Sequence, residues 1–116
     1  MFILVPAYIE NQENGNNSVE NQQILDGLPI ILHCPAGGTP APEFNWFKDG
    51  VLLNLQSDNN VVIVDNGRRL RIAQATSENA GRYSCVAFNE AGEAEKLFQI
   101  DVLGRKCLAC FINQVY

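Results

Sequence analysis

The 116-residue sequence has few basic residues, one histidine and no long apolar run. Its 8 Lys and Arg stand against 13 Asp and Glu, for a net charge of −5. So few cations can neutralise few phosphates, and nucleic acid is not expected as a partner. The longest apolar run, residues 1–7, is far shorter than the roughly 20 residues of a membrane-spanning helix. With one histidine and no recognisable catalytic motif, we expect no enzyme, no small-molecule substrate, and no cofactor or metal site.

The apolar residues follow the two-residue alternation of β-strands. They make up 47% of the chain and charged residues 18%, which is enough for the core of one domain. No stretch keeps a 3.6-residue apolar period over the length of a helix. Leu28, Ile30, Leu32 and Cys34 share one parity and are expected to point inward. Turn residues separate about eight short strands, which predict an antiparallel sandwich or barrel. Two layers must pack together, since a single sheet would leave an apolar face in water.

Both ends and one internal segment fall outside this pattern. Residues 1–7 lack the basic start of a signal peptide. Because residues 2–6 resemble residues 98–104, we expect 1–5 to end a preceding repeat or linker. Eleven of the 14 residues at 10–23 are Asn, Gln or Glu, which predicts a solvated loop or a frayed edge strand. We therefore expect one domain at 6–104, with its Asn/Gln-rich loop at 10–23, and a tail outside it at 105–116.

Four cysteines allow three complete pairings, and their spacing alone does not choose among them. Cys107 and Cys110 form a CxxC motif in the tail. No βαβ pattern surrounds it, so a redox role is not favoured. A zinc site would need four ligands, and only His33 remains as a further strong candidate. His33 has outward parity and is expected at the surface.

Four residues in fixed order carry a family resemblance. Trp46 follows Cys34 by twelve residues, and Tyr83 precedes Cys85 by two, which is the spacing of a tyrosine corner. Together with the motifs at 46–50, 70–72, 79–85 and 87–94, this pattern resembles the immunoglobulin fold and, more narrowly, its I-set type, over about residues 6–103. Segments at 5–9, 37–42 and 92–102 also resemble repeats of hemicentin-type extracellular matrix proteins.

The resemblance implies an all-β, two-sheet immunoglobulin-like sandwich. It implies a non-catalytic protein-interaction module of an extracellular matrix or cell-adhesion protein, with neighbouring immunoglobulin domains and other extracellular proteins as partners. It further implies an extracellular location and a Cys34–Cys85 disulfide within a core that includes Trp46, Tyr83 and Leu70. One alternative is an intracellular structural domain of a titin- or twitchin-type muscle protein, with both thiols reduced. Another is a domain of a cell-surface receptor.

One position departs from the family. An aspartate is usual where this chain has Asn79, so Arg68 or Arg69 is expected to face an amide instead of a carboxylate. The loss of such an exposed ion pair costs at most about 1 kcal/mol, and the fold should survive it. The Tyr83 hydroxyl is expected to bond to the backbone near residues 79–80.

Two further sites are expected on the surface. Phe47, Val86 and Phe88 have outward parity on neighbouring strands of the family's C-F-G sheet, where they would form an apolar face for partners. In the alternative, Leu97 or long side chains of the last strand cover them. Asn16 begins an N-x-S sequon and would accept a glycan in a secreted protein, although an Asn-rich stretch also matches this motif by chance.

Overall fold

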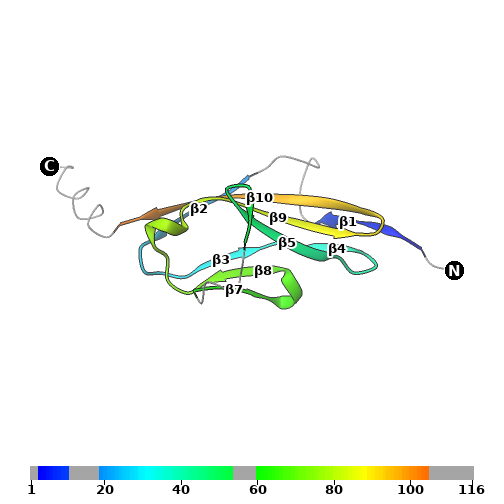
Figure 1. Ribbon diagram of the computed structural model, residues 1–116, viewed down its shortest axis with the longest axis horizontal. Coiled ribbons are helices and arrows are strands. Elements are labelled where there is room, and N and C mark those ends of the chain that lie inside the picture. The colour runs from blue at the N-terminus through cyan, green and yellow to red at the C-terminus, as the bar shows by residue number, and fades with distance from the viewer. Residues whose placement is uncertain (1–2, 11–18, 54–59, 105–116) are drawn as a thin grey trace.

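The computed structural model describes residues 3–10, 19–53 and 60–104, which form an all-β fold (Figure 1). Two single turns of 3-10 helix, η2 (Asp65–Gly67) and η3 (Ser77–Asn79), interrupt the strands. The strands are β1 (Val5–Ile9), β2 (Val19–Leu25), β3 (Ile30–His33), β4 (Ala36–Thr39), β5 (Glu43–Lys48), β6 (Val51–Leu52), β7 (Val61–Val64), β8 (Arg69–Ile72), β9 (Gly81–Asn89) and β10 (Gly92–Leu103).

The strands lie in two layers, as expected. One layer is a five-stranded sheet in the order β2-β10-β9-β5-β6, and the other contains the three-stranded sheet β3-β8-β7. The pair β1-β4 extends the second layer, because β4 follows β3 after a break at Pro35, a residue without an N–H to donate. In Figure 1, β1 and the C-terminal end of β10 lie at opposite ends of the long axis.

The core lies between the layers and is built from alternate residues of the strands. Leu70 and Ile72 are fully buried, whereas Arg69 and Arg71 between them are exposed. The same alternation buries Ile30 and Leu32 of β3. Other buried core residues are Ala7, Ile9, Cys34, Ala36, Trp46, Val61, Ala75, Tyr83, Cys85, Ala87, Phe98 and Ile100.

The inward orientation expected for Leu28 is wrong. Its side chain is exposed, because Leu28 belongs to the turn before β3 and not to the strand. The Leu28 N–H donates to the Leu25 carbonyl, and the Leu28 carbonyl accepts from the Ala75 N–H. These backbone bonds fix a turn in which the strand alternation does not yet apply.

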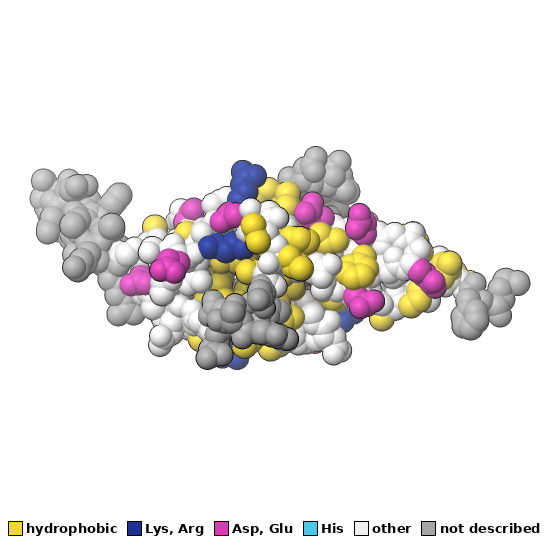
Figure 2. Space-filling view, viewed as in Figure 1, with side chains coloured by type: hydrophobic (Ala, Val, Ile, Leu, Met, Phe, Trp, Pro, Cys, Tyr) yellow, Lys and Arg dark blue, Asp and Glu magenta, His cyan; other side chains and the backbone are white. Residues whose placement is uncertain are grey.

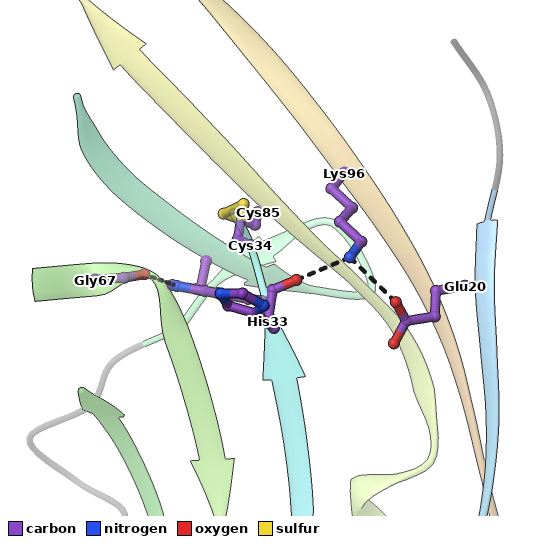
Figure 3. The surroundings of a disulfide bond; sticks show 7 residues. Glu20, His33, Cys34, Gly67, Cys85 and Lys96 are labelled. Carbon is purple, nitrogen blue, oxygen red and sulfur yellow. Dashed lines mark hydrogen bonds and ion pairs between the residues drawn. A yellow bond between two sulfur atoms is a disulfide. The ribbon is translucent and has the colours of Figure 1, made fainter. Parts of the chain in front are cut away.

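A disulfide joins the two layers at the centre of the core. Cys34 follows β3, Cys85 lies on β9, and their Cα atoms are 6.4 Å apart (Figure 3). Trp46 is the register partner of Cys85 and stacks on Phe98 with ring centroids 5.8 Å apart. Its Nε1–H donates to the Gly67 carbonyl at 2.7 Å, so the one polar group of this buried ring is satisfied.

The Tyr83 corner forms as the sequence predicts. The buried Tyr83 hydroxyl donates to the Asn79 carbonyl at 2.6 Å. The Asn79 side chain accepts from the Thr76 N–H at 2.8 Å and so closes the turn η3. Asn79 therefore acts on its own turn through a local capping bond.

The pairing expected between Asn79 and an arginine is wrong. Arg69 instead forms an ion pair with Asp65, with Nε and Oδ2 3.8 Å apart. The Arg68 guanidinium lies over the Phe44 ring at 5.3 Å from its centroid. Both arginines directly follow η2 in the chain, and their partners are Asp65 of η2 and Phe44 of β5. The Asn79 side chain caps η3 instead.

Part of the Asn/Gln-rich segment is an edge strand. Residues 19–23 belong to β2, which pairs in parallel with β10 from Val19 opposite Leu97 to Leu25 opposite Leu103. Of the two structures expected for residues 10–23, an edge strand is therefore correct for 19–23, and residues 11–18 lie outside the described part of the chain. The exposed polar side chains of β2 suit a sheet edge.

Lys96 connects this edge to the other layer. Its Nζ donates to the His33 carbonyl at 2.9 Å and lies 3.1 Å from Oε1 of Glu20 (Figure 3). Partial burial alone would raise the pKa of Glu20. Hydrogen bonds from Gln22 and Lys96, together with the charges of Lys96 and His33, outweigh burial and hold that pKa below its usual value.

Candidate interaction face

Phe47, Val86 and Phe88 lie on the outer face of the five-stranded sheet. In the register of β5 with β9, Phe47 is opposite Ser84, Asn45 opposite Val86 and Glu43 opposite Phe88. Their inward neighbours Trp46, Cys85 and Ala87 are buried, which fixes the outward direction. All three predicted residues are half-buried, so neighbouring side chains cover them in part.

Leu97 extends this surface but is not a direct neighbour of Phe47. Leu97 of β10 is opposite Ser84 of β9, and Phe47 of β5 is opposite the same serine, so strand β9 lies between them. The same row continues to Leu52 on β6, whose side chain is 57% exposed, and to Val19 on β2. Sequence reasoning did not include Leu52 and Val19, because their place beside this face depends on the pairing of two edge strands.

Acidic side chains border the apolar residues. Phe88 has Glu43 on one side and Glu93 on the other, and Val86 has Glu95 beside it. These glutamates are exposed. Figure 2 shows hydrophobic side chains across the middle of the side in view, with acidic side chains among and around them. We call the surface formed by Phe47, Val86 and Phe88, with these glutamates as its acidic border, the five-stranded face.

The five-stranded face is an open depression at the β9–β10 turn. Its lining runs from Asn45 and Phe47 over Val86 and Phe88 to residues 89–93 of the turn. Apolar walls and carboxylates together suit a protein surface with apolar and basic groups. Among the described residues, no group of histidines, cysteines and carboxylates could hold a metal ion, and no helix is long and apolar enough to cross a membrane.

Asn89 holds the end of this face in place. The sequence placed it in a turn and in the family motif at 87–94, without predicting the bonds that its side chain makes. Its Nδ2 donates to the carbonyls of Val5 and Pro40, at 2.8 and 2.9 Å. Its Oδ1 accepts from three backbone N–H groups, those of Ala7 at 3.3 Å, Ala91 at 3.0 Å and Gly92 at 3.1 Å. One side chain thus ties β1, the loop after β4 and the β9–β10 turn together.

The remaining predicted sites have simple outcomes. His33 is exposed, as its parity indicated. Asn16, Cys107 and Cys110 lie outside the described residues, and a glycan at Asn16 stays a prediction.

Comparison with known proteins finds relatives that are 40% or more identical over most of the chain. The chain is 44% identical to human Hemicentin-1 over 98 residues, which cover 84% of the chain and 2% of that protein. It is 40% identical to mouse Vascular endothelial growth factor receptor 2 over 86 residues, covering 72% of the chain and 6% of the receptor. The chain therefore spans only a small fraction of the length of these relatives.

Solved structures agree with the fold. Sidekick-1 immunoglobulin domains 1–4 match with a TM-score of 0.73 at 25% identity, over 85% of this chain and 24% of that one. The titin domains Z1Z2 in complex with telethonin match with a TM-score of 0.73 at 25% identity, over 89% and 49%. The family model for the immunoglobulin I-set domain matches residues 16–102. With its sandwich, its Cys34–Cys85 bridge and this match, the chain belongs to the immunoglobulin I-set family.

Proposed function

We propose that this chain is a non-catalytic protein-interaction module of an extracellular matrix or cell-adhesion protein. The observation that carries the proposal is the five-stranded face, where Phe47, Val86 and Phe88 point away from the core. Apolar side chains on an outer sheet face contribute nothing to the core but favour burial against a partner, at about 25 cal/mol per Å². The likeness to hemicentins and to Sidekick-1 supports the same class.

The module comprises residues 6–104, with the end of a preceding repeat or a linker at 1–5 and a tail at 105–116. Its partners are neighbouring immunoglobulin domains and other extracellular proteins. The Cys34–Cys85 disulfide supports an oxidising, extracellular location. Labelling of free thiols tests this location, in protein taken from its natural source and unfolded in denaturant without reductant, before any exposure to air. Full labelling of Cys34 and Cys85 would favour the muscle-type alternative instead.

A substitution on the five-stranded face tests the function. We expect Phe88→Lys to abolish binding of the purified chain to matrix deposited by cultured cells, because it places a charge in the apolar centre of the face. Leu28→Lys is the control, since it places the same charge on an exposed apolar residue of the turn before β3, outside the five-stranded face. Circular dichroism must show both variants folded. Equal binding by the wild type and both variants would remove the five-stranded face from the proposal.

A further inference from the structure

The opposite side of the sandwich carries a second mixed surface, of opposite charge. On the outer face of the sheet β3-β8-β7, Val62 and Val64 are 43% and 40% exposed. The register places Val62 beside Arg71 and Val64 beside Arg69, and both arginines are exposed. We call this surface, formed by these two valines and two arginines, the three-stranded face.

The two faces carry the same pattern with the charges reversed. On the five-stranded face, Val86 lies beside Glu95 and Phe88 beside Glu93. Each face is therefore a block of two strands and two rows, with apolar residues on one strand and charged residues on the next. Two positions along a strand are about 6.7 Å apart, and adjacent strands about 4.8 Å apart, so the blocks have equal dimensions.

We propose that the five-stranded face of one copy of this chain binds the three-stranded face of a second copy. When the blocks are superposed, Arg69 and Arg71 meet Glu93 and Glu95 while the valines cover Val86 and Phe88. Sheets stack about 10 Å apart, a distance that these side chains can fill. This inference rests on the proposed function, because it names the partner of the same face.

The neighbouring charges leave the arginines available for this contact. Asp65 pairs with Arg69 at 3.8 Å, but both side chains are about half exposed, so the pair is weak and readily exchanged. His33 lies beside Arg69 in the register and is exposed, and it adds no negative charge.

The geometry sets the form of the assembly. The two faces lie on opposite sides of one molecule and differ from one another, so the contact is head-to-tail and does not close into a symmetric pair. Each added copy presents a new free face. Concentration-dependent growth into a series of oligomers is therefore expected, and it should weaken as salt screens the paired charges.

Two charge-reversed variants test the proposal. Variant A carries Glu93→Lys and Glu95→Lys, so the charged strand is basic in both of its blocks. Variant B carries Arg69→Glu and Arg71→Glu, so both of its faces are acidic. In sedimentation velocity at low salt, the wild type should associate with rising concentration, A alone and B alone should stay monomeric, and an equimolar mixture of A and B should associate.

The design separates a specific contact from a general effect of charge. The substitutions in A change the net charge from −5 to −1, which by itself would reduce repulsion and increase association. The proposal requires the opposite result, a loss of association. A control with Glu10→Lys and Asp101→Lys has the same net charge but leaves both blocks intact, and it should associate at least as well as the wild type.

The outcome is independent of the test of the proposed function. A wild type that stays monomeric to millimolar concentration overturns the inference, as does association of A alone or failure of the A and B mixture to associate. If Phe88→Lys still abolishes binding to matrix in that case, the five-stranded face remains a binding face with a different partner. If self-association is found but matrix binding is unaffected, the face serves contacts between copies only.

Discussion

Asn89 offers the sharpest test of how this fold is held together, because one side chain makes five hydrogen bonds to three segments of backbone. Asn89→Ala removes all of them. At the low end of the net value of a hydrogen bond, about 0.5 kcal/mol each, the loss is about 2.5 kcal/mol. The low end applies because Asn89 is only half-buried and water can replace part of each bond.

For a domain of this size, that loss should lower the thermal midpoint by about 10 °C. The midpoint can be measured by circular dichroism with the disulfide intact. Hydrogen exchange adds a local readout, because the Ala7 N–H donates to Asn89 and should lose protection with β1. Asn21→Ala is the control: Asn21 is exposed and makes one long bond, to its own strand, so a change within about 0.5 kcal/mol is expected.

Asn89→Asp distinguishes the hydrogen bonds that the side chain donates from those that it accepts. A carboxylate still accepts from the three N–H groups, but it faces the carbonyls of Val5 and Pro40 where the amide donated. The variant therefore keeps the accepting end of the side chain and loses the two donated bonds. At neutral pH it should be less stable than wild type by about 1 kcal/mol or more, as measured by its thermal midpoint. An Asn89→Ala midpoint within about 3 °C of wild type would refute the reasoning.

Three other perturbations have definite outcomes. Tyr83→Phe removes the bond to the Asn79 carbonyl and should cost about 1 kcal/mol in a urea titration, with an unchanged slope. Reduction of Cys34–Cys85 opens a link across 51 residues and should cost about 4 kcal/mol, measured as the difference in unfolding free energy with and without reductant. Glu20→Gln removes the ion pair with Lys96 and should lower the free energy of unfolding by about 0.5 kcal/mol at neutral pH. Because the pKa of Glu20 is lowered in the folded state, this contribution is present at pH above the usual range for glutamate and is lost as the pH falls through the folded-state pKa. Parallel pH titrations of this variant and the wild type should converge in acid.

The core of this sandwich could be predicted from the sequence because local alternation encodes it. Leu70 and Ile72 point inward and Arg69 and Arg71 outward whatever the rest of the chain does, since successive side chains of a strand leave opposite faces. The Tyr83 corner is equally local, because its acceptor lies four residues away. Such features need no knowledge of which strands pair.

The features that escaped prediction depend on segments far apart in the chain. Asn89 bonds to Val5 across 84 residues, and Lys96 reaches the His33 carbonyl across 63. Neither segment names these distant partners. Asn89 belongs to a family motif but reads locally as a turn former, and Lys96 reads as a surface cation. The acidic border of Phe88 likewise becomes visible only when the register sets Glu43 and Glu93 beside it.

The division between inward and outward positions also explains where modules of this fold acquire different partners. An inward residue such as Phe98 is fully buried against its neighbours, and a change of its volume costs stability at once. An outward residue such as Glu93, which is exposed, can change with little effect on folding, because its side chain is in contact with water in place of the core. Selection for a partner can therefore act on rows such as Glu43–Phe88–Glu93 while the core stays constant. An apolar group kept on such a row, where the fold does not require it, points to binding.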